Sequence, residues 1–253
     1  MDLGLTDRVF LVTAASSGLG RATARHLVDE GARVVLVARR FDALDAVVAD
    51  LGRSAAVAMA ADLSAPDTAT NAVRLALNSF GRLDGALVSV GGPPAGTVLG
   101  TTDDQWNDAF TSVFVAALRV TRAVVEHGTA DDLAIAWVLS TSVKSPIGGL
   151  AASNGLRPGL AMLVKQLADE LGPQGTRVLA LLPGRIETDR VRHLDSLSDD
   201  PEAARRAAEQ TIPLRRYGRP DEFGRVAAFA LSPAASYLTG CVVPVEGGAL
   251  RSL

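Results

Sequence analysis

Short segments made almost entirely of apolar residues recur along this chain, and they restrict its fold more than any other feature. Val9–Val12 is one such run, and Val34–Val37 is the centre of another. A half-buried strand alternates apolar and polar residues, whereas a strand buried on both faces does not. These runs therefore predict strands of a parallel sheet that is covered by helices on both sides.

Helix-forming segments separate the apolar runs. The predicted strands are residues 9–12, 32–38, 55–60, 86–89, 134–139, 178–182 and 241–245. The clearest predicted helices are at about residues 21–29, 68–80, 103–126, 156–171 and 221–231. An alternation of seven strands with six helices predicts an α/β fold, with a Rossmann-type doubly wound parallel sheet in a three-layer αβα arrangement.

The chain is expected to form one domain. It has 253 residues, 48% of them hydrophobic, which is enough for one large core. No linker-like segment divides it, so residues 1–253 are predicted to be a single Rossmann-like domain. One long irregular stretch, at about residues 187–216, is interpreted as a substrate arm that serves as a lid or binding loop. Within it, Asp199-Asp200-Pro201 is typical of a helix start.

Scarce residue types exclude several kinds of site. Cys241 is the only cysteine, which excludes an internal disulfide, a thiolate zinc cluster and an iron–sulfur centre. The three histidines lack helical pairing, and no metal site is expected. A formal net charge of -3 gives no indication of a nucleic-acid or membrane partner. We expect a cytoplasmic protein that acts on a small molecule.

A turn of small residues follows the first predicted strand and opens the first helix. Such a turn exposes backbone N–H groups at a helix N-terminus, where a pyrophosphate can bind. In this position a plain strand-to-helix turn is the weaker alternative. The residues expected to bind a dinucleotide here are Thr13, Ser16, Ser17, Gly18, Leu19 and Gly20.

The second predicted strand ends without the acid that usually bonds the ribose of NAD. Ala38 is followed instead by Arg39 and Arg40, and arginines suit a 2′-phosphate, so NADP is favoured over NAD. Two surface arginines that merely end a strand are the alternative. Beyond the third and fourth strands, Asp62-Leu63 and Gly91-Gly92 are expected beside the adenine and the ribose.

Taken together, these motifs resemble the classical short-chain dehydrogenase/reductase family over nearly the whole chain. Residues 13–20 resemble its TGxxxGxG turn with Ala14 in place of the first glycine, and residues 243–248 resemble its VxVDGG motif. The resemblance adds cofactor-binding residues from the positions of its NNAG and PGxxxT motifs: Ser89, Val90, Gly91, Gly92, Pro183, Gly184, Ile186 and Thr188. Among its branches, the chain is most similar to 3-oxoacyl-carrier-protein reductase-like members with a degenerate catalytic tetrad.

The family transfers a hydride between a nicotinamide and a carbonyl or alcohol, with an Asn-Ser-Tyr-Lys tetrad. In this sequence Ser140 matches the serine, but Ser153 and Arg157 stand where the tyrosine and lysine belong, and Val113 stands for the asparagine. No tyrosine in the chain has a lysine four residues later. A serine hydroxyl is too weak an acid to replace the phenol, and arginine cannot shuttle protons.

Other polar residues near Ser140 are candidates for the missing chemistry. Lys144 is a candidate acid or a solvated loop residue, and Ser142 and Asn154 are candidate substrate donors or turn residues. Arg157 can still anchor a cofactor or polarise an oxygen. On the arm, His193 is a weaker candidate, and a group of arginines could favour an acidic substrate: Arg185, Arg190 and Arg192.

The sequence leaves three functions open. The first is an NADP(H)-dependent oxidoreductase with a non-standard active site, in which Ser140, Ser153, Arg157 and Lys144 are the catalytic candidates. The others are a catalytically silent NADP-binding protein and a non-redox lyase or isomerase. The family resemblance also implies a homo-oligomer, a dimer or tetramer, in which these residues could form the contact: Phe110, Phe114, Ala117, Leu118, Met162 and Leu163.

Overall fold

A computed structural model describes residues 2–252 of the chain and contains one parallel sheet of seven strands. Its order is β3-β2-β1-β4-β5-β6-β7, so the direction of winding reverses between β1 and β4. The strands are β1 (Val9–Thr13), β2 (Arg33–Ala38), β3 (Ala56–Ala60), β4 (Gly85–Ser89), β5 (Ala134–Val138), β6 (Arg177–Pro183) and β7 (Val242–Val245). The predicted doubly wound sheet is confirmed.

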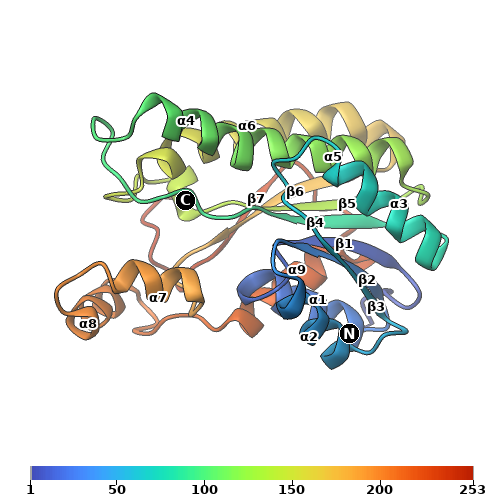
Figure 1. Ribbon diagram of the computed structural model, residues 1–253, viewed down its shortest axis with the longest axis horizontal. Coiled ribbons are helices and arrows are strands. Elements are labelled where there is room, and N and C mark those ends of the chain that lie inside the picture. Colours follow the sequence, from blue (N-terminus) through green and yellow to red (C-terminus); the bar gives the residue numbers. More distant parts are fainter. Residues whose placement is uncertain (1, 253) are drawn as a thin grey trace.

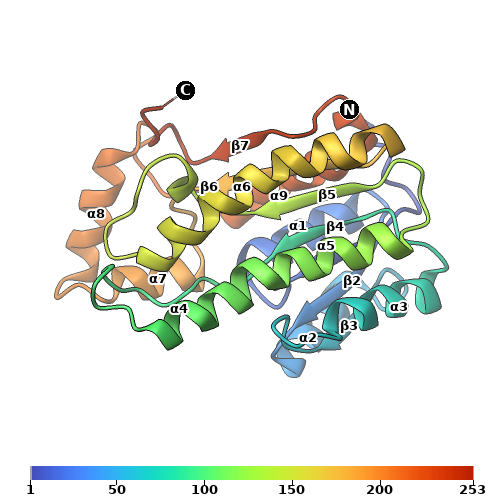
Figure 2. The ribbon, with the colours of Figure 1, turned by 90° about the horizontal axis from the view of Figure 1, so that it is seen from above.

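Helices cover both faces of the sheet, as Figure 1 shows. One face carries α1 (Gly18–Asp29), α2 (Phe41–Leu51) and α9 (Pro220–Leu231). The other carries α3 (Thr68–Phe80), α4 (Asp103–Ala109), α5 (Ala116–His127) and α6 (Ala151–Leu171). The arm after β6 contains α7 (Asp189–Asp195) and α8 (Pro201–Thr211), which project beyond the sheet in Figure 2.

The core consists of two apolar layers, one on each side of the sheet. Phe10 and Leu36 belong to one layer, whereas their strand neighbours Leu11 and Val35 belong to the other. Successive side chains of a strand point to opposite faces. Because both faces are buried, apolar residues are required at every position, which explains the runs in the sequence.

The helices differ from the prediction in three places. The described residues contain nine α-helices, not six, because the arm adds α7 and α8 and the helix predicted at 103–126 is divided into α4 and α5; no bounds were predicted for α2. Helix α6 begins at Ala151, not near residue 156, and Pro158 lies inside it. The long helix predicted at 103–126 is interrupted by a π-helix, η1 (Phe110–Val115). The helix start at Pro201 is correct, with Asp200 as its N-cap.

Residues 2–252 contain neither a membrane-spanning helix nor a cluster of metal-binding side chains. None of the helices found there has both the length and the apolar character needed to cross a membrane. Nor do three or more histidine, cysteine, aspartate or glutamate side chains come together there as a metal ion would require.

Candidate active site

The glycine turn connects β1 to α1 at the carboxyl edge of the sheet. Gly18 has a φ of 56°, and Ala14 adopts the left-handed region with a φ of 51°. A Cβ atom on Gly20 would lie 2.7 Å from the Ala14 carbonyl oxygen, so only glycine fits there. Ser16, Ser17 and Leu19 are half-buried around this turn. The first turn of α1 therefore approaches the strand closely, as binding of a pyrophosphate requires.

Thr13 and Ser89 connect the ends of β1 and β4. The Thr13 hydroxyl donates to the Ser89 carbonyl oxygen at 2.6 Å and accepts from the Ser89 amide at 2.8 Å. Thr13 is completely buried, and Val90 is nearly so. Thr13 thus holds the end of β4 against the end of β1. The predicted cofactor residues Val90 to Gly92 come directly after this end of β4.

The segment after β6 meets the glycine turn. A Cβ atom on Gly18 would lie 3.2 Å from the Thr188 Cγ2 atom, and the Thr188 hydroxyl caps α7 by accepting from Val191 at 3.4 Å. Gly184 is required because a Cβ atom there would lie 2.6 Å from the Cβ of Glu246. Pro183 is half-buried, and the side chain of Ile186 is buried in the core.

A groove of about 670 Å³ lies beside this contact and is lined by Ser17, Gly18 and Thr188, among others. It joins the start of α1 to the start of the arm. Two regions separated by about 170 residues thus line one groove.

Both arginines after β2 are exposed, and so is Asp62 after β3. The Asp62 carboxylate accepts from the Ser64 amide at 2.8 Å and from the Ser64 hydroxyl at 2.7 Å. These bonds, with a smaller effect of the positive charge of Arg39, lower the pKa of Asp62 below its ordinary value. Leu63 is half-buried beside it. Arg39 and Arg40 can therefore reach a 2′-phosphate from solvent.

Three serines lie near the end of β5. Ser140 is half-buried, and its hydroxyl oxygen accepts from the Ser142 amide at 3.1 Å. The Ser142 and Ser153 hydroxyls are buried and lie 3.0 Å apart. Ser153 is therefore bonded to Ser142 and not to Ser140. The bond between Ser142 and Ser153 was not expected from the sequence, because neither residue type indicates a partner eleven positions away.

The loop between these serines is fixed by Asn154. Its side chain accepts from the Ile147 amide and donates to the Ile147 carbonyl oxygen, both at 2.9 Å. Asn154 therefore holds the loop, which agrees with its interpretation as a turn residue and not as a donor to the substrate. Lys144 is half-buried at the end of the 3-10 turn η2 (Thr141–Val143). Val113, at the asparagine position, is buried within the π-helix.

Arg157 is a buried cation on α6. Its Nη1 atom donates to the carbonyl oxygens of Val138, at 3.2 Å, and Leu139, the two residues before Ser140. Its Nε atom is buried without a hydrogen-bond partner. Burial, with a smaller effect of the positive charge of Arg190, lowers the pKa of Arg157 to about 10. The guanidinium still carries its charge at neutral pH, beside the backbone of the two residues that precede Ser140.

Arg190 reaches from the arm to the loop after β4. Its Nη2 atom donates to the Pro93 carbonyl oxygen at 2.6 Å. A Cβ atom on Gly92 would lie 2.8 Å from the Arg190 Nε atom, so this glycine leaves room for the guanidinium. Burial lowers the pKa of Arg190. Nothing in the sequence indicates that Gly92 accommodates an arginine from the arm.

The other two arginines of the predicted group are paired. Arg185 donates to Asp195 at 2.6 Å, and Arg192 donates to Asp189 at 2.6 Å. The spacing of three residues between Asp189 and Arg192 could have predicted the second pair. His193 is exposed. Only Arg190 remains of the arginine group as a candidate for binding an acidic substrate.

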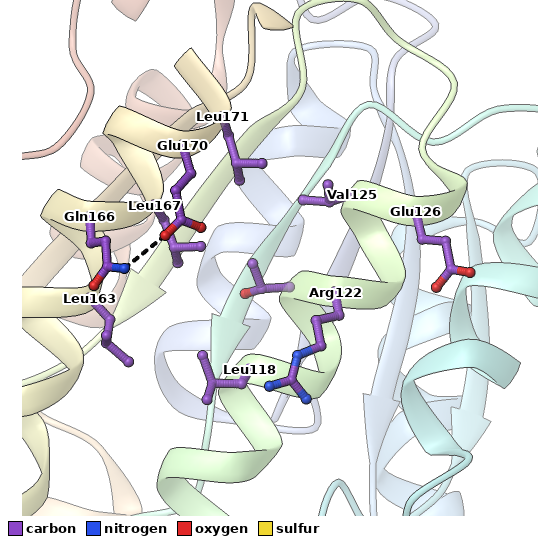
Figure 3. Close-up of a pocket in the computed structure, with 10 residues that line it drawn as sticks. Leu118, Arg122, Val125, Glu126, Leu163, Gln166, Leu167, Glu170 and Leu171 are labelled. Carbon is purple, nitrogen blue, oxygen red and sulfur yellow. Dashed lines mark hydrogen bonds between the residues drawn. The ribbon is translucent and has the colours of Figure 1, made fainter. Parts of the chain in front are cut away.

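A second groove, of about 560 Å³, lies between α5 and α6 on the outer face of the molecule, away from the strand ends (Figure 3). Apolar side chains line it, among them Leu118, Val125, Leu163 and Leu167. Its rim is charged, and the Gln166 amide donates to Glu170 at 2.8 Å. Of the residues predicted to form an oligomer contact, Phe110 and Met162 are exposed, whereas Ala117 is buried in its own core.

Comparisons with known proteins identify the family of the chain. A family model described as enoyl-(acyl carrier protein) reductase matches residues 13–249. Levodione reductase from Leifsonia aquatica is 33% identical over an alignment that covers 96% of this chain and 94% of the relative.

Two solved structures are similar over almost their whole length. L-sorbose reductase from Gluconobacter frateurii, complexed with NADPH and L-sorbose, has a TM-score of 0.94 and 28% identity, with 100% of both chains covered. An NADPH-bound short-chain oxidoreductase from Pseudomonas aeruginosa, described as containing an atypical catalytic center, has a TM-score of 0.89 and 28% identity, with 98% of both chains covered.

Proposed function

The chain belongs to the short-chain dehydrogenase/reductase family, and on that premise we propose that it is an NADP(H)-dependent oxidoreductase that interconverts a carbonyl group and an alcohol. The observation that carries this proposal is the contact between Thr188 and Gly18, which joins the arm to the glycine turn.

The preference for NADP rests on the end of β2. Arg39 and Arg40 are exposed there, where the 2′-phosphate of a dinucleotide on the glycine turn would lie. Two guanidinium groups suit a phosphate better than a ribose hydroxyl. The NADPH complexes of two similar proteins agree with this choice. The backbone of the glycine turn, Ser89 to Gly92 and Thr188 would hold the rest of the cofactor.

When bound, NADPH would supply a hydride to the carbonyl carbon. Ser140 would hold the carbonyl oxygen: its own oxygen accepts from Ser142, so its hydroxyl proton is available to the substrate. The positive charge of Arg157, which lies on the carbonyl oxygens of Val138 and Leu139, would help to stabilise negative charge on that oxygen. The proton that completes the alcohol would come from water, from the substrate or from Lys144, because the buried Ser153 is bonded to Ser142.

A catalytically silent NADP-binding protein is the second candidate. It is favoured by the buried Val113 and by the engagement of Ser153 with Ser142, which leave no phenol or amide at the positions of the usual acid and its water. In that case NADPH would bind without being consumed. A lyase or isomerase on the same fold would transform a substrate while the nicotinamide stays unchanged.

A fluorescence titration tests the cofactor first. NADPH should bind at micromolar concentrations and NADH about tenfold or more weakly, as loss of a charged phosphate contact implies. Arg39→Ala should remove most of this difference, whereas the matched variant Arg53→Ala, an exposed arginine paired with Asp45, should keep it. Absence of NADPH binding below the millimolar range would refute the proposal.

A turnover assay then separates the candidates. Ketones, 3-oxoacyl thioesters and the corresponding alcohols are incubated with NADPH or NADP⁺, and absorbance at the nicotinamide band is followed together with product analysis. Consumption of NADPH with alcohol formation supports the oxidoreductase. Binding without turnover of any compound supports the silent protein, and product formation at constant NADPH supports the lyase or isomerase.

We also propose that α5 and α6 form the contact of a homo-oligomer, as the family resemblance implies. The apolar groove between them and the exposed Met162 support this. Light scattering should give the mass of a dimer or tetramer, and Leu163→Glu should shift it toward the monomer. A wild-type protein with the mass of a monomer would contradict the proposal.

A further inference from the structure

The turn after β3 is held by hydrogen bonds between its own residues. The Asp62 carboxylate accepts from the Ser64 amide and hydroxyl at 2.8 and 2.7 Å, and the Asp62 carbonyl oxygen accepts from the Thr68 hydroxyl at 2.6 Å. Leu63, between the two, packs against the apolar layer on this face of the sheet. Residues 62–68 therefore form a compact turn with a defined backbone shape.

Arg119 adds a bond to this turn from a distant helix. It is the fourth residue of α5, and its Nη1 atom donates to the Ser64 carbonyl oxygen at 2.6 Å, across 55 positions of the sequence. Arg119 is half-buried, and α5 packs beside α3, the helix that follows the turn. A hydrogen bond from a charged donor is stronger than one between neutral groups. Arg119 therefore ties the tip of the turn to the neighbouring helix layer.

The same turn lies beside the arginines at the end of β2. The Ala61 amide donates to the Ala38 carbonyl oxygen at 2.9 Å, and Arg39 follows Ala38 directly. In the sheet, β2 stands between β3 and β1, and β1 leads into the glycine turn. A dinucleotide with its pyrophosphate on the glycine turn extends its adenosine half across the ends of the neighbouring strands. The turn after β3 is therefore placed to border that half.

We propose that Arg119 is a positioning residue for the adenosine half of the cofactor. It acts through the turn: by holding the Ser64 carbonyl oxygen, it keeps the backbone of Asp62 and Leu63 in the shape that receives the adenine before the cofactor arrives. A binding loop that is already ordered loses less conformational entropy when the ligand binds, so the affinity is higher. The inference rests on the proposed function, because the ligand is a dinucleotide, but it does not require turnover.

An arginine that only stabilises the fold is the alternative. Loss of such a residue would lower the free energy of unfolding, but the molecules that remain folded would bind every ligand as before. A positioning residue has a different effect, because its loss weakens one half of the cofactor selectively. The two halves are available as separate probes: adenosine 2′,5′-bisphosphate carries the adenine and the 2′-phosphate, and reduced nicotinamide mononucleotide carries the nicotinamide.

The experiment measures binding of both probes and of NADPH to the full chain, by calorimetry and by nicotinamide fluorescence. Arg119→Met should weaken binding of adenosine 2′,5′-bisphosphate and of NADPH about fivefold or more, because the ligand must then order the turn. The affinity for reduced nicotinamide mononucleotide should change less than about twofold, because the turn does not border that half. Arg119→Lys should retain part of the lost affinity, because an ammonium group can donate to the same carbonyl oxygen.

Two further variants provide the controls. Arg74 is an exposed arginine of α3 whose guanidinium donates to the Asn71 side chain on the same helix at 3.1 Å, so Arg74→Met should leave all three affinities unchanged. Thr68→Val keeps the shape of the side chain but removes the hydroxyl that holds the Asp62 carbonyl oxygen. It should therefore reproduce the selective loss of Arg119→Met. Circular dichroism would establish that each variant is folded.

Hydrogen exchange without ligand adds an independent measurement. The amides of residues 63–65 should exchange faster in Arg119→Met than in the wild type, because the turn opens more often. Unchanged exchange, equal affinities of Arg119→Met and Arg74→Met for adenosine 2′,5′-bisphosphate, or equal losses for the two halves of the cofactor would each overturn the inference. If the wild type binds NADPH, these results leave the proposed function intact. A wild type that binds neither NADPH nor adenosine 2′,5′-bisphosphate would refute both.

Discussion

Two buried arginines at opposite edges of the sheet show how differently one residue type can be used. Arg177 is the first residue of β6, at the amino edge, and Arg157 lies against the last residues of β5, at the carboxyl edge. Burial lowers the pKa of both. Their guanidinium groups bond to backbone carbonyls, but only that of Arg157 includes a buried nitrogen without a partner in residues 2–252.

Arg177 connects the end of α9 to the sheet. Its guanidinium donates to the carbonyl oxygens of Ala230 at 3.0 Å, Ser232 at 2.9 Å and Leu238 at 3.2 Å. The last carbonyls of a helix lack partners within the helix and carry partial negative charge, so a cation there is favourable. Asp132 adds a further favourable charge. The buried cation at the amino edge is therefore fully paired within the protein, whereas Arg157 at the carboxyl edge keeps one nitrogen without a partner in residues 2–252.

The largest effect is expected from Arg177→Met. Three carbonyl oxygens would lose their donor in a dry environment, and the free energy of unfolding should fall by about 3 kcal/mol. Arg157→Met also removes hydrogen bonds, but it relieves a buried and incompletely paired charge, so its loss should stay below about 1 kcal/mol. Urea denaturation followed by circular dichroism measures both. Equal losses in the two variants would show that Arg157 is a structural residue like Arg177.

The sequence alone could not distinguish these two arginines. The partners of Arg177 are backbone carbonyls 53 to 61 positions away, and those of Arg157 are 18 and 19 positions away. Every residue type has the same backbone carbonyl, so the sequence does not show which carbonyl will accept a hydrogen bond. The strands could be predicted because burial on both faces requires apolar residues at every position, which is a local signal.

The missed helix boundaries have a similar explanation. Helix α2 follows Arg40 and α6 follows Leu150, and neither residue forms a side-chain cap. The usual Ser, Thr, Asp or Asn start signal was therefore absent. Proline lacks the amide donor that a helix interior uses, yet Pro158 lies inside α6, so the start predicted near residue 156 is too late. Gly52, which ends α2, was the signal that could have revealed that helix.

Of the candidate site, the sequence predicted the parts that depend on backbone shape. Gly18, Gly20 and Gly184 are glycines because a Cβ atom would be strained or crowded, and such constraints remain visible in sequence. The contacts between side chains were not predictable in this way. Arg190 was grouped with its neighbours on the arm, and only the structure showed that the neighbours are paired.

A smaller effect is expected at Ala14, in the glycine turn of the carboxyl edge. Its φ of 51° is unfavourable for alanine by about 1–2 kcal/mol. Glycine would relieve this strain but would also make the unfolded chain more flexible, so Ala14→Gly should raise the free energy of unfolding by about 0.5–1 kcal/mol. Thermal denaturation measures the gain. A lower free energy of unfolding in Ala14→Gly would mean that the turn is not strained. Arg157 would then be the only unfavourable feature described at the carboxyl edge.

The smallest effect is expected at the start of α9, where the carboxyl edge does pair its charges. Glu222 accepts from Arg216 at 2.7 and 2.8 Å and from the Arg219 amide at 2.7 Å, which lowers the pKa of Glu222 to about 2. Because its pKa in the folded chain lies below the ordinary value of 4.5, its contribution is full above pH 4.5 and disappears as the pH falls toward 2. Glu222→Gln should therefore lower the free energy of unfolding by less than about 1 kcal/mol at pH 7. Denaturation curves between pH 2 and 7 should show the two proteins converging at the acid end. A difference in the free energy of unfolding that stays constant with pH would mean that the Glu222 side chain acts through its shape and not through its charge.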